Sequence, residues 1–110
     1  MHDQKVRWAP AVVMLPGEID VSNAQWVFDQ LSSAFASGAT LVIADLTKTV
    51  FCDSTGLGIL LRVQRQAARN GAQLRLAIAP GGPVKRVFDL MGLDRLLSVY
   101  PTRAQAAARP

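Results

Sequence analysis

The segment FCDSTGLGIL, residues 51 to 60, holds the side chains of this chain that are best suited to chemistry. Asp53, Ser54 and Thr55 place a carboxylate beside two hydroxyls, directly before a run with helical periodicity. Other reactive groups are scarce, because the chain has one histidine and one cysteine, His2 and Cys52. The segment therefore belongs either to the active site of an enzyme or to a regulatory switch.

The enzymatic interpretations fail for lack of partner residues. A nucleophilic Ser54 needs a general base, and the sole histidine is His2 near the start of the chain. The Gly-x-Ser-x-Gly elbow is absent because Cys52 stands where its first glycine belongs. A dinucleotide fingerprint at Gly56-Leu57-Gly58 lacks its third glycine, which is replaced by Leu61, and no Gly-Lys-Ser/Thr or cluster of metal ligands occurs. We expect no enzymatic activity, cofactor or metal.

A structural role accounts for part of the segment. The side chain of Asp53 or Ser54 would cap the following helix by accepting a hydrogen bond from an early backbone N–H. Gly56 and Gly58 then stand within the first turns, where glycine lowers helix propensity. Small residues at these positions favour a surface that another chain approaches closely.

Length and composition indicate a single domain over residues 1–110. Half of the 110 residues are hydrophobic, so the chain can bury a core without disulfides, and a lone Cys52 cannot form one internally. The opening MHDQKVRW has no signal-type apolar segment, and no apolar run approaches the roughly 20 residues that cross a bilayer. We expect a soluble protein of the reducing cytoplasm.

The formal net charge of +4 does not by itself indicate a nucleic-acid binder. Arg62, Arg65 and Arg69 have the spacing of one helix face, but no aromatic residue interleaves with them and no nucleic-acid motif accompanies them. A solvated outer face is the favoured interpretation.

Predicted strands and helices alternate along the chain. The strands are KVRW and AVVML on either side of Pro10, then TLVIADL, LRLAIA and LLSVY, at residues 5–8, 11–15, 40–46, 74–79 and 96–100. The continuous apolar run at residues 40–46 is typical of a strand buried on both faces, at the centre of a sheet. This alternation predicts an α/β fold of four or five strands with parallel crossovers.

Four helices are predicted from apolar periodicity and end signals. The first has a capping box of Ser22 and Gln25 and ends at Gly38; the second begins after Asp53-Ser54 and ends at Asn70-Gly71; the third begins at Pro83 and ends at Gly92; Thr102 and Gln105 cap the last. The predicted apolar faces of the second and third helices are Leu57, Leu60, Leu61, Ala67 and Ala68, and Val84, Val87, Phe88 and Met91.

Three segments resemble the signature of STAS domains, specifically of bacterial anti-sigma factor antagonists. The first comprises Asp45-Leu46, Val50-Phe51 and Asp53-Ser54-Thr55-Gly56-Leu57; Gly17-Glu18-Ile19-Asp20 is similar to the turn before the family's first helix, and Pro83-Val84-Lys85-Arg86-Val87-Phe88 with Gly92-Leu93 to its third-helix pattern. The resemblance covers nearly the whole chain. It implies the STAS fold, a small mixed sheet of four or five strands with about four helices.

The resemblance also implies a function in sigma-factor control. Members bind an anti-sigma factor that is also a GHKL-type serine kinase, and thereby free a sigma factor for transcription. The kinase uses ATP to phosphorylate the first hydroxyl residue after the signature aspartate, which here is Ser54, and a PP2C-type phosphatase reverses the reaction. An alternative within the family is a scaffold or regulatory subunit of a larger assembly, such as a stressosome or a lipid-transport ATPase.

The surface expected to face the partner surrounds Ser54. Its residues are Asp20, Ser22, Asp53, Thr55 and Gly56. Asp20 is equally well explained as a turn residue before a helix, and Asp45 is expected to be structural at the end of the central strand. Cys52 is interpreted as a small buried hydrophobic residue in preference to a redox sensor.

Overall fold

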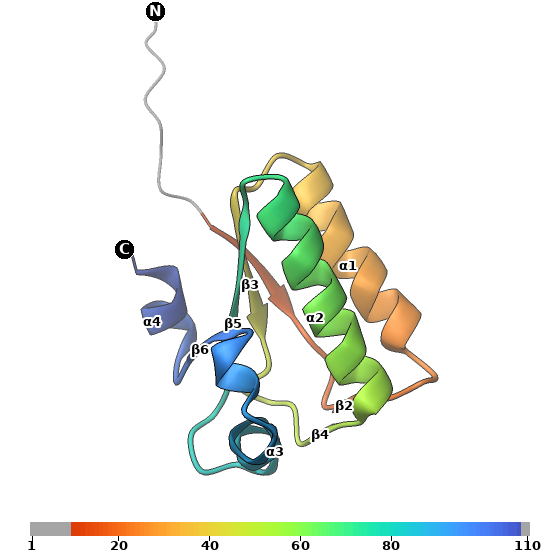
Figure 1. Ribbon diagram of the computed structural model, residues 1–110, viewed down its shortest axis with the longest axis vertical. Helices are drawn as coiled ribbons and strands as arrows, with labels where there is room; N and C mark the ends of the chain where they lie inside the picture. The colour runs from red at the N-terminus through yellow and green to blue at the C-terminus, as the bar shows by residue number, and fades with distance from the viewer. Residues whose placement is uncertain (1–9, 109–110) are drawn as a thin grey trace, which may run out of the picture.

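The computed structural model of the chain describes residues 10–108. Strands and helices alternate along most of this length, which confirms the predicted α/β class (Figure 1). The strands are β1 (Ala11–Met14), β2 (Glu18–Ile19), β3 (Leu41–Asp45), β4 (Phe51–Cys52), β5 (Gln73–Ala77) and β6 (Ser98–Tyr100). The helices are α1 (Ala24–Ala36), α2 (Ser54–Arg69), α3 (Pro83–Met91) and α4 (Arg103–Ala107), and a 3₁₀ turn, η1 (Leu93–Arg95), precedes β6.

The main sheet has its strands in the order β1-β3-β5-β6, and a second, smaller sheet joins β2 to β4. All 5 residues of β3 are buried, as the continuous apolar run predicts. Every strand pair within residues 10–108 is parallel, so the antiparallel pairing of a mixed sheet is not found there. The strand predicted at residues 5–8 lies outside the described residues.

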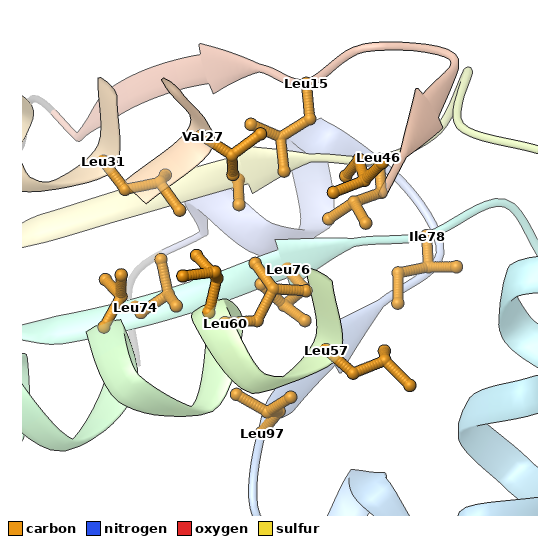
Figure 2. Close-up of a cluster of buried hydrophobic side chains, with 14 of the residues drawn as sticks. Leu15, Val27, Leu31, Leu46, Leu57, Leu60, Leu74, Leu76, Ile78 and Leu97 are labelled. Carbon is orange, nitrogen blue, oxygen red and sulfur yellow. The ribbon is translucent and has the colours of Figure 1, made fainter. Parts of the chain in front are cut away.

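The main sheet separates two hydrophobic layers. Helices α1 and α2 lie side by side against one face, and α4 covers part of the other (Figure 1). Alternate residues of a strand point to opposite faces of a sheet. On the side of α1 and α2 they join the larger core (Figure 2), whereas Leu41, Ile43 and Ala77 pack with Ala106 of α4.

The start of α1 differs from the predicted capping box. Its N-cap is Asn23, whose side chain makes no capping hydrogen bond. The Ser22 hydroxyl instead donates to Asp20 Oδ1, and the Gln25 side-chain amide donates to Asp29 Oδ1. The predicted capping box is wrong because the Ser22 hydroxyl donates its hydrogen bond to the carboxylate of Asp20, two residues earlier, and does not cap the helix.

The remaining helix ends follow the predicted signals. α2 stops before Asn70-Gly71, Pro83 is the first residue of α3, and Gly92 ends α3 in the left-handed conformation with φ 64°. Thr102 caps α4 by accepting a hydrogen bond from the Gln105 N–H. Within residues 10–108, no helix combines the length and the apolar character that a membrane span requires.

Two predicted apolar faces are narrower in the structure. Ala68 is exposed on α2, and on α3 only Val84 and Phe88 are buried, whereas Val87 and Met91 are exposed. Helix α3 packs at the end of the fold against β4 and η1, so one side of its apolar stripe has no neighbouring element among the described residues.

The last strand is also shorter than predicted. β6 begins at Ser98, whereas the apolar run that predicted it begins at Leu96. The Leu97 N–H donates to the Leu93 carbonyl, so this part of the backbone continues the turn of η1 before the strand begins.

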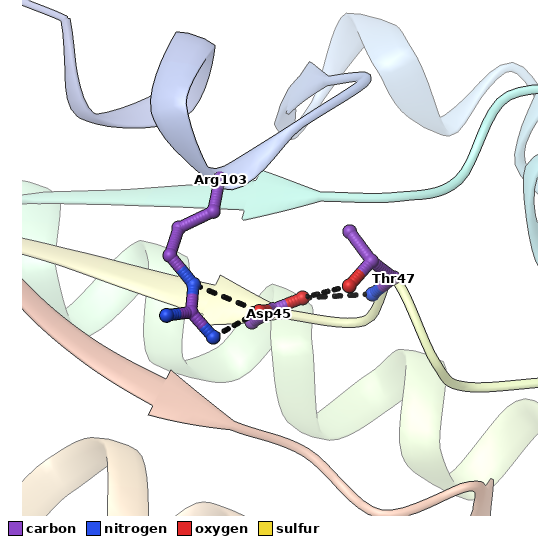
Figure 3. Close-up of polar contacts among 3 residues, drawn as sticks. All are labelled: Asp45, Thr47 and Arg103. Carbon is purple, nitrogen blue, oxygen red and sulfur yellow. Dashed lines mark hydrogen bonds and ion pairs between the residues drawn. The ribbon is translucent and has the colours of Figure 1, made fainter.

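Helix α4 is attached to the sheet at both of its ends. Arg103 Nε and Nη2 donate to Asp45 Oδ2 at 3.0 and 2.8 Å, and Thr47 donates to Oδ1 through its N–H and its hydroxyl (Figure 3). At the other end, Arg75 Nη1 donates to the Ala108 carbonyl at 2.8 Å. Asp45 therefore has the structural role that its position predicts.

The environment of Asp45 sets the sign of a pH effect. Its side chain is 4% exposed, and this burial is the strongest influence on its pKa and opposes ionisation. The hydrogen bonds from Thr47 and the pairing with Arg103 together outweigh it, so the pKa of Asp45 lies below its usual 3.8. A lowered pKa stabilises the fold above pH 3.8, and this stabilisation is lost as the pH falls through the folded-state pKa.

Replacing Asp45 by asparagine should therefore destabilise the protein in a pH-dependent way. At pH 7 we expect the free energy of unfolding to fall by about 1.5–3 kcal/mol, the usual net contribution of a hydrogen bond to a charged group. Urea denaturation at pH 7 and pH 3 measures the effect, which should be smaller at pH 3. Asp94→Asn, at an exposed position, serves as the control and should change stability by less than about 0.5 kcal/mol. An equal loss at both pH values for Asp45→Asn would contradict the assignment.

Candidate functional site

The smaller sheet brings together two aspartates that are distant in the sequence. Ile19 of β2 lies opposite Cys52 of β4 in parallel register. The Asp53 N–H donates to the Ile19 carbonyl at 3.0 Å, which continues the ladder by one step. Asp20 and Asp53 are the residues that directly follow the two strands. Because the strands are parallel and paired in register, both aspartates lie at the carboxyl end of the small sheet, next to each other.

Asp53 is the N-cap of α2. Its backbone is extended, and its Oδ1 accepts a hydrogen bond from the Gly56 N–H at 3.0 Å. Of the two residues considered for the cap, Asp53 therefore has that role, and Ser54 is the first residue of the helix. Ser54 and Thr55 are both exposed, and within residues 10–108 neither hydroxyl makes a hydrogen bond.

The two glycines of the segment have different roles. Gly56 is buried, and a Cβ built on it would lie 2.7 Å from both Cys52 Sγ and Ile19 Cγ2. Gly58 is exposed, and a Cβ there would meet nothing within 4 Å. The packing of the fold thus explains Gly56 and leaves Gly58 unexplained. Gly56 itself contributes to the site through its N–H and through the close approach of α2 to the small sheet.

Asp20 and Ser22 form a compact turn at the entrance to α1. Asp20 Oδ1 accepts hydrogen bonds from the N–H and the hydroxyl of Ser22, and the Asp20 N–H donates to Asn23 Oδ1. The Ser22 hydroxyl is the main cause that lowers the pKa of Asp20, with the Ser22 N–H next. The structure therefore gives Asp20 the turn role, and its charge remains at the surface beside Asp53.

Cys52 is a half-buried thiol beneath this surface. Burial, and then the charge of Asp53, raises the pKa of Cys52 to about 12. The thiol is therefore protonated at neutral pH, where the thiolate that redox chemistry needs is scarce. This environment supports the interpretation of Cys52 as a packing residue.

Exposed apolar side chains flank the site, and the sequence interpretation missed them. Val21, Val50 and Phe51 are 77%, 58% and 50% exposed. Val21 follows Asp20, and Phe51 lies opposite Glu18 on the small sheet. Apolar residues in a turn and in a two-residue strand have few neighbours to bury them, and no signal in the sequence marked these positions as exposed. Such clusters mark surfaces that contact other molecules.

Three carboxylates lie at the small sheet, directly before the start of α2. Glu18, Asp20 and Asp53 lie on the two strands of the small sheet or directly after them, and none of the three forms an ion pair within residues 10–108. The same part of the chain contains no group of three histidine, cysteine, aspartate or glutamate side chains that could hold a metal ion. The site therefore combines exposed hydroxyls, carboxylates that form no ion pair with the described residues, and exposed apolar side chains.

Alanine substitutions of the two glycines should have opposite effects on stability. Gly56→Ala forces the small sheet and α2 apart, so we expect a loss of about 1–3 kcal/mol, as for an overpacked core. Gly58→Ala adds a methyl group in open space within a helix and should stabilise the protein by about 0.5–1 kcal/mol. Chemical denaturation of both variants measures these changes. Equal effects at the two positions would show that the start of α2 is not tightly packed.

Comparison with known proteins identifies the family to which this fold belongs. Residues 3–106 match the STAS domain family. Over 87 residues the chain is 31% identical to the anti-sigma-B factor antagonist of Bacillus subtilis, covering 79% of this chain and 78% of that protein. The fold of this chain resembles the solved structure of the anti-sigma factor antagonist SpoIIAA in its unphosphorylated form. The TM-score is 0.70 and the identity 27%, over 94% of this chain and 89% of that chain. The phosphorylated form of the Bacillus cell fate determinant SpoIIAA gives TM-score 0.65 and 25% identity, over 94% and 92% of the two chains. The chain belongs to the STAS domain family.

Proposed function

We propose that this STAS domain is an anti-sigma factor antagonist whose binding is switched off by phosphorylation of Ser54. The observation that carries the proposal is the exposed Ser54 hydroxyl at the first residue of α2, without a hydrogen-bond partner in the described part of the chain. The names of the relatives support the class of function, and one solved relative is a phosphorylated form.

The proposed modification needs a kinase and ATP. The Ser54 oxygen attacks the γ-phosphorus of ATP, its proton passes to a base on the kinase, and ADP leaves. We infer that the kinase is the anti-sigma factor itself, of the GHKL type, and that a PP2C-type phosphatase hydrolyses the phosphoserine. The hydroxyl is accessible for such a reaction, because Ser54 is exposed and Asp53 fixes the start of the helix beneath it.

The fold can accept a phosphate at this position. The first turn of a helix presents unsatisfied backbone N–H groups and the positive end of the helix dipole, both of which favour an anion. Because Ser54 is exposed, a phosphate there would displace no core residue. We therefore expect the modified protein to remain folded.

The same phosphate would oppose a complex. It adds almost two negative charges to a surface that already carries Asp20 and Asp53. In the complex this charge must leave water, which costs several kcal/mol for an ion without a partner, and its repulsion by Asp20 and Asp53 grows once water no longer screens it. About 1.4 kcal/mol already weakens binding tenfold, so no conformational change is needed.

The proposed partner-binding surface has a polar and an apolar part. Its polar residues are Asp20, Ser22, Asp53 and Thr55, and Gly56 acts indirectly by positioning Asp53 and α2. Val21 and Phe51 add exposed apolar area beside them, and burial of apolar surface is the dominant favourable term in most protein–protein association. Gly58, exposed one turn after Ser54, leaves space for the partner to approach the helix closely.

Phosphate should be found on Ser54 and not on Thr55 after incubation with the cognate kinase and ATP. Ser54→Ala should bind the anti-sigma factor and resist modification, because it keeps the surface and removes the acceptor. Ser54→Asp should bind at least about tenfold more weakly, since it adds one of the charges that the phosphate brings. Mass spectrometry locates the phosphate, and titration of the purified partner measures the affinities.

Thr55→Ala is the matched control for this experiment. It removes the neighbouring exposed hydroxyl and should still be phosphorylated at Ser54. Phosphate on Thr55, or a Ser54→Asp variant that binds like the unmodified protein, would defeat the assignment. Recovery of a lipid-transport ATPase or stressosome subunit in place of a kinase, after copurification from the native host, would support the alternative function as a subunit of a larger assembly.

A further inference from the structure

A second candidate site lies at the carboxyl end of the main sheet, apart from the surface around Ser54. This hollow has a volume of about 450 Å³ and is lined by residues at or after the ends of all strands of that sheet. Ligand pockets of proteins commonly measure about 300–1,000 Å³. In open α/β sheets, ligands bind outside the carboxyl ends of the strands, where the strand order reverses. This hollow lies at the carboxyl ends, although the order β1-β3-β5-β6 has no reversal among the described strands, so the case for a ligand rests on its size and its lining.

The charged residues of the hollow are arranged around a buried carboxylate. Both oxygens of Asp45 are already bonded, one to Thr47 and the other to Nε and Nη2 of Arg103 (Figure 3). This pairing neutralises Asp45 and fixes the orientation of the guanidinium, whose side chain is 48% exposed. Nη1 of Arg103 makes no hydrogen bond with the described residues.

A second cation stands at the rim. Lys48 follows Thr47, is exposed and forms no ion pair within residues 10–108. With one carboxylate and two cations, the hollow carries a net positive charge. It would attract an anion, and the carboxylate would not repel that anion strongly because both of its oxygens are occupied.

The remaining lining is largely apolar. Met14 at the end of β1 is 51% exposed, and Pro80 and Pro101 follow β5 and β6. An exposed methionine adapts its shape to a bound group at little cost. A ligand that fits this lining has an apolar body as well as a negative charge.

We propose that this hollow binds a small organic anion. Its carboxylate or phosphate group contacts Lys48 and Nη1 of Arg103, and its apolar body rests on Met14 and the two prolines. Binding would also hold Arg103 in place and so reinforce the attachment of α4 to the sheet. The inference does not depend on phosphorylation of Ser54 or on an anti-sigma partner.

Amide NMR titrations with phenyl phosphate, benzoate, inorganic phosphate and benzyl alcohol test the proposal. Phenyl phosphate or benzoate should shift the resonances of Thr47, Lys48 and Thr102. Whichever of the two binds more tightly identifies the preferred anionic group. Inorganic phosphate and benzyl alcohol should each bind at least about fivefold more weakly, because each lacks one half of the recognised chemistry.

Variants separate a specific site from general attraction to a basic protein. Lys48→Ala should weaken binding of the aromatic anion about fivefold, whereas Arg65→Ala, at an exposed position on α2, should leave it unchanged. Met14→Ser should weaken phenyl phosphate and leave inorganic phosphate unaffected. Shifts confined to the arginines of α2 or to the start of that helix would overturn the proposal. So would benzyl alcohol that binds as tightly as the anions, or a Lys48→Ala variant that binds like the unmodified protein.

Discussion

The close approach of α2 to the small sheet is the constraint on which the site depends. Gly56 touches Ile19 and Cys52 so closely that no side chain fits between them. Its N–H is also the group that Asp53 caps. The two contacts fix the residue at which the helix begins, and therefore place Ser54 at its exposed first position. A larger residue at position 56 would disturb the cap, the small sheet and the orientation of both hydroxyls together.

The main sheet supports most of the core, whereas the small sheet positions the residues of the candidate site. The main sheet carries the two hydrophobic layers and, through Asp45 and Arg75, holds α4 on its second face. The small sheet adds Ile19 to the larger core, and its two strand ends set Asp20 and Asp53 side by side. Because the carboxylates and hydroxyls lie outside the core, charge can be added at the site without removing the contacts that stabilise the fold.

Most helices and strands were predicted from local sequence patterns, each of which lies within the element itself or at its ends. A continuous apolar run identified β3, and Asn70-Gly71, Gly92 and Thr102 marked helix ends correctly. The small sheet was missed because strands of two residues show no periodicity. The capping box at Ser22 was wrong because a local pattern does not show that Asp20 takes the hydroxyl. The exposed side of α3 likewise depends on which elements lie next to it.

The sequence indicated several residues of the candidate site, but it did not indicate which of them lie next to one another in the fold. Asp53 and Ser54 stand out in the sequence because a carboxylate and hydroxyls precede a glycine-rich helix start. That Asp20 lies beside them depends on pairing between β2 and β4, which are distant along the chain. The apolar contribution of Val21 and Phe51 depends on their exposure, which follows from packing and cannot be read from residue type.

The central claim is that a phosphate on Ser54 changes binding without changing the fold. The most direct test compares fully phosphorylated and unmodified protein in two measurements, the free energy of unfolding and the affinity for the anti-sigma factor. We predict that the unfolding free energy changes by less than about 1 kcal/mol, as for a surface change, while the affinity falls at least about a hundredfold, or roughly 2.8 kcal/mol. A phosphoprotein that binds as tightly as the unmodified one, or one that loses as much stability as affinity, would contradict the account.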